Sequence, residues 1–216
     1  MKRLLSIELQ KIWMNKASRV LTLCYFVLLS FIALIASIKF EIGVVKLHLA
    51  EMGIFNFPFI WHFNTYIAAW LKFFLAIVIV SMMANEYSYG TLKQNLIDGM
   101  SKKEFILSKF LTIIAFAVCS TVFIFILTLI LGYSFSSYTE PSIVFSSLTY
   151  MIAFFVKLIG FFSFCLFLGI LVKRSAFALG FLLIWTIIES IAKGFLVFKI
   201  FPDSKIASKI TQFFPL

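Results

Sequence analysis

Long apolar runs separated by short polar segments dominate the chain. They lie at about residues 20–38, 66–84, 110–132, 150–172 and 176–192. About 20 apolar residues are enough for an α-helix to cross a bilayer, and a helix satisfies its backbone hydrogen bonds internally in lipid. The pattern therefore predicts an all-α fold: a single transmembrane domain over residues 1–216, a polytopic membrane helix bundle with five visible spans.

Residues 1–19, before the first run, are amphipathic rather than uniformly apolar. Their apolar residues recur at helical spacing: Leu5, Leu9, Ile12 and Trp13. The positions between them are polar or basic: Lys2, Arg3, Gln10 and Lys11. This pattern predicts a helix lying in the membrane interface. The alternative is an ordinary positively charged flank of the first span.

Composition supports a membrane protein and excludes an ordinary soluble domain. The chain is 62% hydrophobic and only 13% charged, whereas soluble domains are about half apolar. Its formal charge of +10 arises from 19 Lys and Arg against 9 Asp and Glu. In a soluble protein this excess would suggest nucleic acid. Here it predicts contact with the lipid bilayer and its anionic head groups, and no nucleic-acid partner.

The placement of the basic residues predicts the orientation of the chain. Lys and Arg gather before the first run, between the second and third, and in the link Lys173-Arg174 between the fourth and fifth, whereas residues 133–149 have none. The positive-inside rule puts the basic side, and with it the N-terminus, in the cytoplasm. We therefore expect a multi-pass protein of the cell (inner, cytoplasmic) membrane. Residues 193–216, although they hold four lysines, are expected outside as an extracellular or re-entrant segment.

No catalytic or metal-binding motif is present in the sequence. Cys24, Cys119 and Cys165 lie inside apolar runs without C-x-x-C spacing, which predicts buried small hydrophobic side chains. His48 and His62 fall in the first external loop without ligand spacing, and we expect them at the surface. No G-x-x-x-x-G-K-[ST] motif occurs, so we expect no nucleotide or other cofactor on this chain, no metal and no enzymatic activity of its own.

The polar segment between the second and third runs encodes its own short helix. Thr91 followed by Gln94 is a capping-box pattern, which predicts that Thr91 caps a helix. Gly99 supplies a left-handed stop about two turns later. Ser101 and Glu104 repeat the capping pattern and predict the start of the next helix.

This segment, residues 85–109, resembles the cytoplasmic coupling segment of type-2 ABC transporter permeases, the membrane subunits of exporters. The family pattern is matched by an acidic residue, a Gly-Thr pair, a short helix, a turn, a basic stretch and a final lysine: Glu86, Gly90-Thr91, Leu92–Asp98, Gly99-Met100, Ser101-Lys102-Lys103 and Lys109. Ser101 stands where many members have proline. The resemblance implies six spans, one more than the five visible runs.

The resemblance also implies a function and partners. The short helix would dock into a groove on a separate ATPase subunit, which would bind ATP and Mg, and a second permease subunit, the same or related, would face this one across a substrate path. The expected ATPase-coupling residues are Glu86, Gly90, Thr91, Leu92, Lys93, Gln94, Asn95, Leu96, Ile97, Asp98, Ser101, Lys102 and Lys103. Leu92, Leu96 and Ile97 would form an apolar side of the helix. The alternative for this segment is a structured loop without a partner.

Three charged residues fall inside the apolar runs: Lys72, Lys157 and Glu189. Intramembrane charges are costly, and they often mark functional sites. With the orientation above, all three lie at similar depth in the outer half of the membrane. This suggests an intramembrane polar layer in which Glu189 pairs with one of the lysines. The alternative is that the lysines snorkel to the head groups.

Other classes of membrane protein also fit the composition. A polytopic scaffold or assembly protein of an envelope complex would be equally apolar, basic on one side and free of catalytic motifs. An ion-coupled carrier would show intramembrane acids nearer the midplane or broken helices in repeated halves, and the sequence has no internal repeat of that kind.

Overall fold

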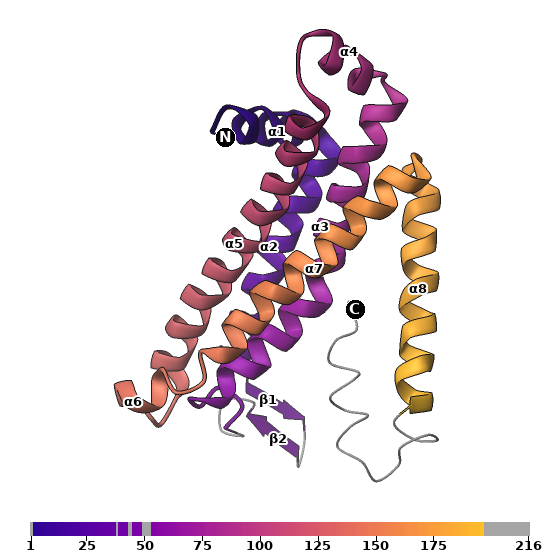
Figure 1. Ribbon diagram of the computed structural model, residues 1–216. Coiled ribbons are helices and arrows are strands. Elements are labelled where there is room, and N and C mark those ends of the chain that lie inside the picture. Colours follow the sequence, from indigo (N-terminus) through magenta and orange to yellow (C-terminus); the bar gives the residue numbers. More distant parts are fainter. Residues whose placement is uncertain (1, 38, 43–44, 49–52, 197–216) are drawn as a thin grey trace.

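The computed structural model describes residues 2–37, 39–42, 45–48 and 53–196, and these residues are almost entirely helical (Figure 1). The helices, in chain order, are α1 (Lys2–Met14), α2 (Lys16–Ser37), α3 (Phe59–Ser88), α4 (Thr91–Ile97), α5 (Lys102–Phe135), α6 (Pro141–Val144), α7 (Thr149–Val172) and α8 (Ser175–Phe195). Strands β1 (Lys39–Ile42) and β2 (Val45–His48) form an antiparallel hairpin between α2 and α3.

Four segments are long and apolar enough to cross a membrane: α3, α5, α6 with α7, and α8. Helices α1 and α2 pass the same test only together, and they meet at 94°. The described residues thus contain four candidate spans by length and composition, or five if the bent pair counts as one. This confirms the all-helical membrane class predicted from the sequence, while the number of spans stays a prediction.

The described helices extend beyond the predicted spans, most clearly in α3. This helix begins at Phe59, well before residue 66, where the apolar run begins. Its first turns contain polar groups that are buried and hydrogen-bonded to other helices. The Trp61 indole donates to the carbonyl oxygen of Val144 at 2.7 Å, and the Asn64 amide donates to the Thr128 hydroxyl at 2.9 Å. Hydropathy alone misses these turns because it takes no account of such pairing.

The amphipathic N-terminal segment forms two helices rather than one up to residue 19. Helix α1 ends at Met14, and α2 begins at Lys16 after the sharp bend. The side chain of Asn15 accepts a hydrogen bond from the backbone N–H of Ser18 at 3.2 Å. This is N-cap geometry for α2. The cap marks the start of α2 at the bend, four residues before the predicted end of the interfacial helix.

Helix α3 lies at the centre of the bundle and packs against α2, α5, α7 and α8. Gly169 of α7 lets this helix approach α3 closely, because an added Cβ would lie 3.0 Å from the Cβ of Met83. Helix α8 stands at the edge, beside α7 in Figure 1, and contacts α3 and α7. Many of its apolar side chains are exposed on the outer surface of the bundle.

Three further predictions, on the cysteines, the histidines and residues 193–216, agree with the structure only in part or fall outside its described residues. Cys165 is buried and Cys24 half-buried, but Cys119 is exposed, so burial was wrong for that residue. Cys119 lies on an outward-facing side of α5, and in a membrane protein such a side contacts lipid rather than other helices. His62 is exposed, as predicted, but it belongs to α3 and not to a loop. Of the segment 193–216, the structure describes only the end of α8 and Leu196, and residues 197–216 lie outside the described residues.

Candidate functional site

The short helix predicted in the polar segment is present as α4. Two glycines in the left-handed region bound it, Gly90 with φ of 69° and Gly99 with φ of 95°. The backbone N–H of Gly99 donates to Leu96 and that of Met100 to Asn95, at 3.3 and 3.0 Å. These two bonds form a Schellman motif. The predicted glycine stop is therefore confirmed.

The predicted capping role of Thr91 is wrong. Helix α4 begins at Thr91 itself, its N-cap is Gly90, and no side chain caps it. The Thr91 hydroxyl instead donates to Oε2 of Glu86. An ionised carboxylate is a strong acceptor, and this one lies five residues before Thr91, across the turn at Gly90.

The second predicted capping box is confirmed at the start of α5. The backbone N–H of Glu104 donates to the Ser101 hydroxyl at 3.2 Å, and the backbone N–H of Ser101 donates to the Glu104 carboxylate at 2.9 Å. Both residues are exposed, as are Lys102 and Lys103. This part of the predicted site therefore lies at the surface.

The structure divides the predicted apolar side of α4. Leu92 and Leu96 are half-buried, and Leu92 packs against the core. Ile97 projects outward and is 83% exposed. The remaining exposed side chains of the helix and its C-cap are polar: Lys93, Gln94 and Asp98. We call Lys93, Gln94, Ile97 and Asp98 the outer face of α4.

Glu86, at the end of α3, connects α4 to the rest of the bundle. Its Oε2 atom accepts from Thr91 and, at 3.4 Å, from the side-chain amide of Asn95. Its Oε1 atom accepts from the ammonium groups of Lys11 at 2.9 Å and Lys109 at 2.7 Å. One carboxylate thus joins α4 on one side to α1 and α5 on the other.

A second carboxylate, that of Glu8 in α1, completes this arrangement. Lys109 donates to Glu8 Oε2 at 2.6 Å, and Lys11 lies 3.5 Å from Glu8 Oε1. We call Glu8, Lys11, Glu86 and Lys109 the Glu86 cluster; its two carboxylates and two ammonium groups balance in formal charge. The side chains of Glu8, Glu86 and Lys109 are at most 5% exposed. Charges this buried are tolerated only when they are paired.

Lys11 is the more accessible cation of the cluster, on a helix that runs across the spanning helices. Its burial opposes the charged form, but the hydrogen bond that Lys11 donates to Glu86 and the charges of Glu8 and Glu86 outweigh burial and leave the pKa of Lys11 raised. Lys11 therefore supports the two carboxylates as a cation.

Glu8 is not among the predicted site residues, although the sequence around it contains a signal. Leu4, Glu8 and Ile12 follow one another at i, i+4 spacing and are all buried, so they form the inward face of α1. Leu9 and Trp13 are exposed, and they remain available to a membrane surface. A carboxylate at a helix position flanked by apolar residues four before and four after suggests a buried partner. Only tertiary structure reveals which one.

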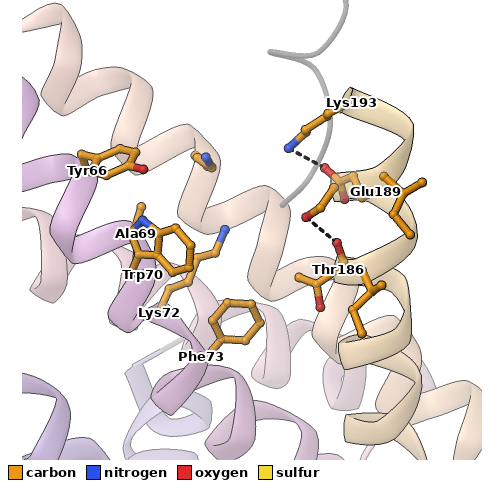
Figure 2. Close-up of a pocket in the computed structure, with 12 residues that line it drawn as sticks. Tyr66, Ala69, Trp70, Lys72, Phe73, Thr186, Glu189 and Lys193 are labelled. Carbon is orange, nitrogen blue, oxygen red and sulfur yellow. Dashed lines mark hydrogen bonds and ion pairs between the residues drawn. The ribbon is translucent and has the colours of Figure 1, made fainter. Parts of the chain in front are cut away.

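The three predicted intramembrane charges line one cavity of about 570 Å³ between α3, α7 and α8 (Figure 2). Lys72 is buried and Lys157 is exposed. Glu189 forms an ion pair with Lys193, one turn further along α8, at 3.0 Å. The structure thus brings the three residues together at one cavity. It also places Lys193, which was not among the predicted residues, in the lining of that cavity. The Lys72 ammonium lies 4.2 Å from the centre of the Phe161 ring, a cation–π contact.

Within the described part of the chain, no group of three or more His, Cys, Asp or Glu side chains could hold a metal ion. The chemistry available at the two sites is that of ion pairs and hydrogen bonds. Long apolar helices packed around α3, with buried charges that are paired or gathered at a cavity, define a polytopic helical membrane protein.

Comparison with known protein families assigns the chain to one of them. It belongs to DUF2705, a family of proteins of unknown function, whose family model matches residues 33–214. No curated protein matches the chain. No solved structure matches it either.

Proposed function

We propose that this chain is the membrane-spanning permease subunit of an ATP-driven exporter of the ABC class. One observation carries the proposal: a short, terminated helix exposes an outer face while a buried ionic cluster fixes its inner side to three longer helices. A loop that only joined two spans would need neither feature. The resemblance of residues 85–109 to the coupling segment of type-2 permeases supports the same function.

In this proposal the outer face of α4 docks on a separate ATPase subunit that holds ATP and Mg. Movement of the ATPase would displace α4 as a rigid body, because its Schellman stop and its bonds to Glu86 keep it ordered. Glu86 is the last buried residue of α3, so displacement of α4 would act directly on the central helix of the bundle. Lys109 and Glu8 would transmit the displacement of α4 to α5 and α1.

The proposal includes an orientation and a second membrane subunit. The end of the bundle with α1 and α4 would face the cytoplasm, with the protein in the inner (cytoplasmic) membrane. A second subunit, the same or related, would complete the substrate path. The exposed apolar side chains of α8 suit such a contact and suit lipid equally.

Site-specific photo-crosslinking tests the docking. A photoreactive amino acid replaces Ile97 in cells that naturally make the protein, and crosslinked polypeptides are identified by mass spectrometry. We expect a crosslink to a polypeptide with a G-x-x-x-x-G-K-[ST] motif. The matched control places the same photoreactive group at Tyr138, which is 53% exposed beyond the other end of α5, and should give no such crosslink.

A functional test follows once that ATPase is known. Ile97→Asp puts a charge on the outer face without touching the Glu86 cluster. It should lower ATPase stimulation by the membrane subunit while membrane insertion stays normal. If position 97 never crosslinks to an ATPase and Ile97→Asp has no effect, the chain is better described as a scaffold of an envelope complex.

A further inference from the structure

The cavity between α3, α7 and α8 has a composition unlike that of an ordinary packing defect. Its walls are mainly apolar and aromatic, with contributions from Tyr66, Trp70 and Phe73. A volume of about 570 Å³ lies within the usual range of small-molecule sites, roughly 300–1,000 Å³. Packing defects in protein interiors are far smaller.

The charges that the described residues bring to the cavity are unbalanced. Among these lining residues three are lysines (Lys72, Lys157 and Lys193) and one is an acid (Glu189), so the described part of the lining carries a formal charge of +2. The Glu189–Lys193 ion pair is neutral as a unit. The remaining positive charge therefore belongs to Lys72 and Lys157.

Lys72 is the more informative of the two. Its residue is only 3% exposed, yet no carboxylate among the described residues lies within ion-pair distance of its ammonium group. The contact with the Phe161 ring at 4.2 Å compensates only part of the desolvation of a cation. An anion in the cavity would supply the missing partner, and Lys157, which also lines the cavity, would contribute a second charge to it.

The rim of the cavity indicates the route by which such an anion arrives. Tyr66 and Trp70 on α3 are 57% and 66% exposed, and Ile187 and Ile191 on α8 are 60% and 66% exposed. These side chains belong to helices long and apolar enough to span the membrane, so the rim is open to lipid chains wherever no second subunit covers it. A ligand entering there needs an apolar part as well as a charge.

We propose that this cavity binds an anionic amphiphile, with its phosphate or carboxylate head held by Lys72 and Lys157 and its chain lying against the apolar rim between α3 and α8. The proposal goes beyond the exporter function and does not depend on it. The crosslinking experiment at Ile97 could fail while this one succeeds.

Lipid retention measured by native mass spectrometry tests the proposal. The purified protein is reconstituted in nanodiscs with equal amounts of phosphatidylglycerol and phosphatidylcholine, then transferred to detergent and weighed with its bound lipid. We expect selective retention of phosphatidylglycerol. The double variant Lys72→Met/Lys157→Met should lower that retention by about tenfold or more, since each lysine contributes a charge-assisted contact.

The controls separate binding from folding and from general surface charge. Lys173→Met removes an exposed lysine outside the cavity and should leave retention unchanged, and Lys72→Arg keeps the charge and should preserve it. Circular dichroism and size-exclusion chromatography report folding. If the double variant does not fold, Lys157→Met alone, at an exposed position, should still lower retention.

Competition experiments distinguish an amphiphile from a free inorganic anion as the ligand. Displacement of phosphatidylglycerol by oleate would support the proposal and show that a carboxylate head is accepted. Displacement by inorganic phosphate alone would overturn it, because the apolar part would then contribute nothing. Equal retention of phosphatidylcholine, or full retention of phosphatidylglycerol by the folded double variant or by folded Lys157→Met, would overturn it as well.

Discussion

The ammonium of Lys109 lies 2.7 Å from Oε1 of Glu86 and closes the segment that carries α4. The two residues are 23 positions apart, one near the end of α3 and the other in the first turns of α5. Their ion pair fixes both ends of this segment at one point in the bundle. The same Lys109 ammonium reaches Glu8 of α1 at 2.6 Å, so a single buried cation joins three helices.

Lys109→Met should destabilise the protein strongly. The variant leaves two buried carboxylates to share the partly exposed Lys11, and removing one partner of a buried ion pair typically costs about 3–5 kcal/mol. Thermal unfolding in detergent should show a large decrease in Tm. Lys102→Met, an exposed lysine on the same helix, should change stability by no more than about 0.5 kcal/mol. Equal Tm values for the two variants would show that the cluster does not stabilise the fold.

Thr91→Val should loosen α4 without affecting the bundle. Valine keeps the shape of threonine but removes the hydroxyl that donates to Glu86. The loss of a hydrogen bond to a charged group costs about 1.5–3 kcal/mol, so amide hydrogen exchange in α4 should rise about tenfold or more. Exchange in α3 and α7 should not change. The matched control is Thr121→Val, whose hydroxyl donates only to the Ala117 carbonyl of its own helix at 2.8 Å. Unchanged exchange in α4 would contradict a role of Glu86 in holding this helix.

Gly99→Ala should destabilise the C-terminal end of α4 through the backbone alone. An added Cβ at Gly99 meets nothing within 4 Å, but the φ of 95° is one that L-residues rarely adopt. The strain costs roughly 1–2 kcal/mol, so trypsin should cleave at the exposed Lys93 about tenfold faster. Gly180→Ala, inside α8 and also without a neighbour within 4 Å, should leave this cleavage unchanged. A cleavage rate equal to that of the wild type would show that the glycine stop is dispensable.

Gly132→Ala should be destabilising for a steric reason. A Cβ at Gly132 would lie 2.1 Å from the ring of Phe57, which is buried, so the ring must move at a cost of about 1–3 kcal/mol. Phe57→Leu is expected to restore part of the loss, and a double-mutant cycle by thermal unfolding would measure the coupling. Gly160→Ala, with open space around the glycine, serves as the control. Strictly additive effects of Gly132→Ala and Phe57→Leu would mean that the two residues do not constrain each other.

Some of the structure follows from the order of residues alone. Hydropathy locates the apolar helices because a helix that crosses lipid must be apolar over about 20 residues wherever its neighbours lie. Gly99, Ser101 and Glu104 act within one or two turns, so the stop after α4 and the capped start of α5 are also local properties. These predictions needed no knowledge of the fold.

Tertiary structure decided which charges meet. Glu8 and Lys109 are 101 residues apart, and neither residue indicates the other in the sequence. Lys72, Lys157 and Glu189 line one cavity only because α3, α7 and α8 pack side by side. Local patterns determine where helices begin and end, whereas burial of charge depends on contacts between helices, which a linear sequence does not display.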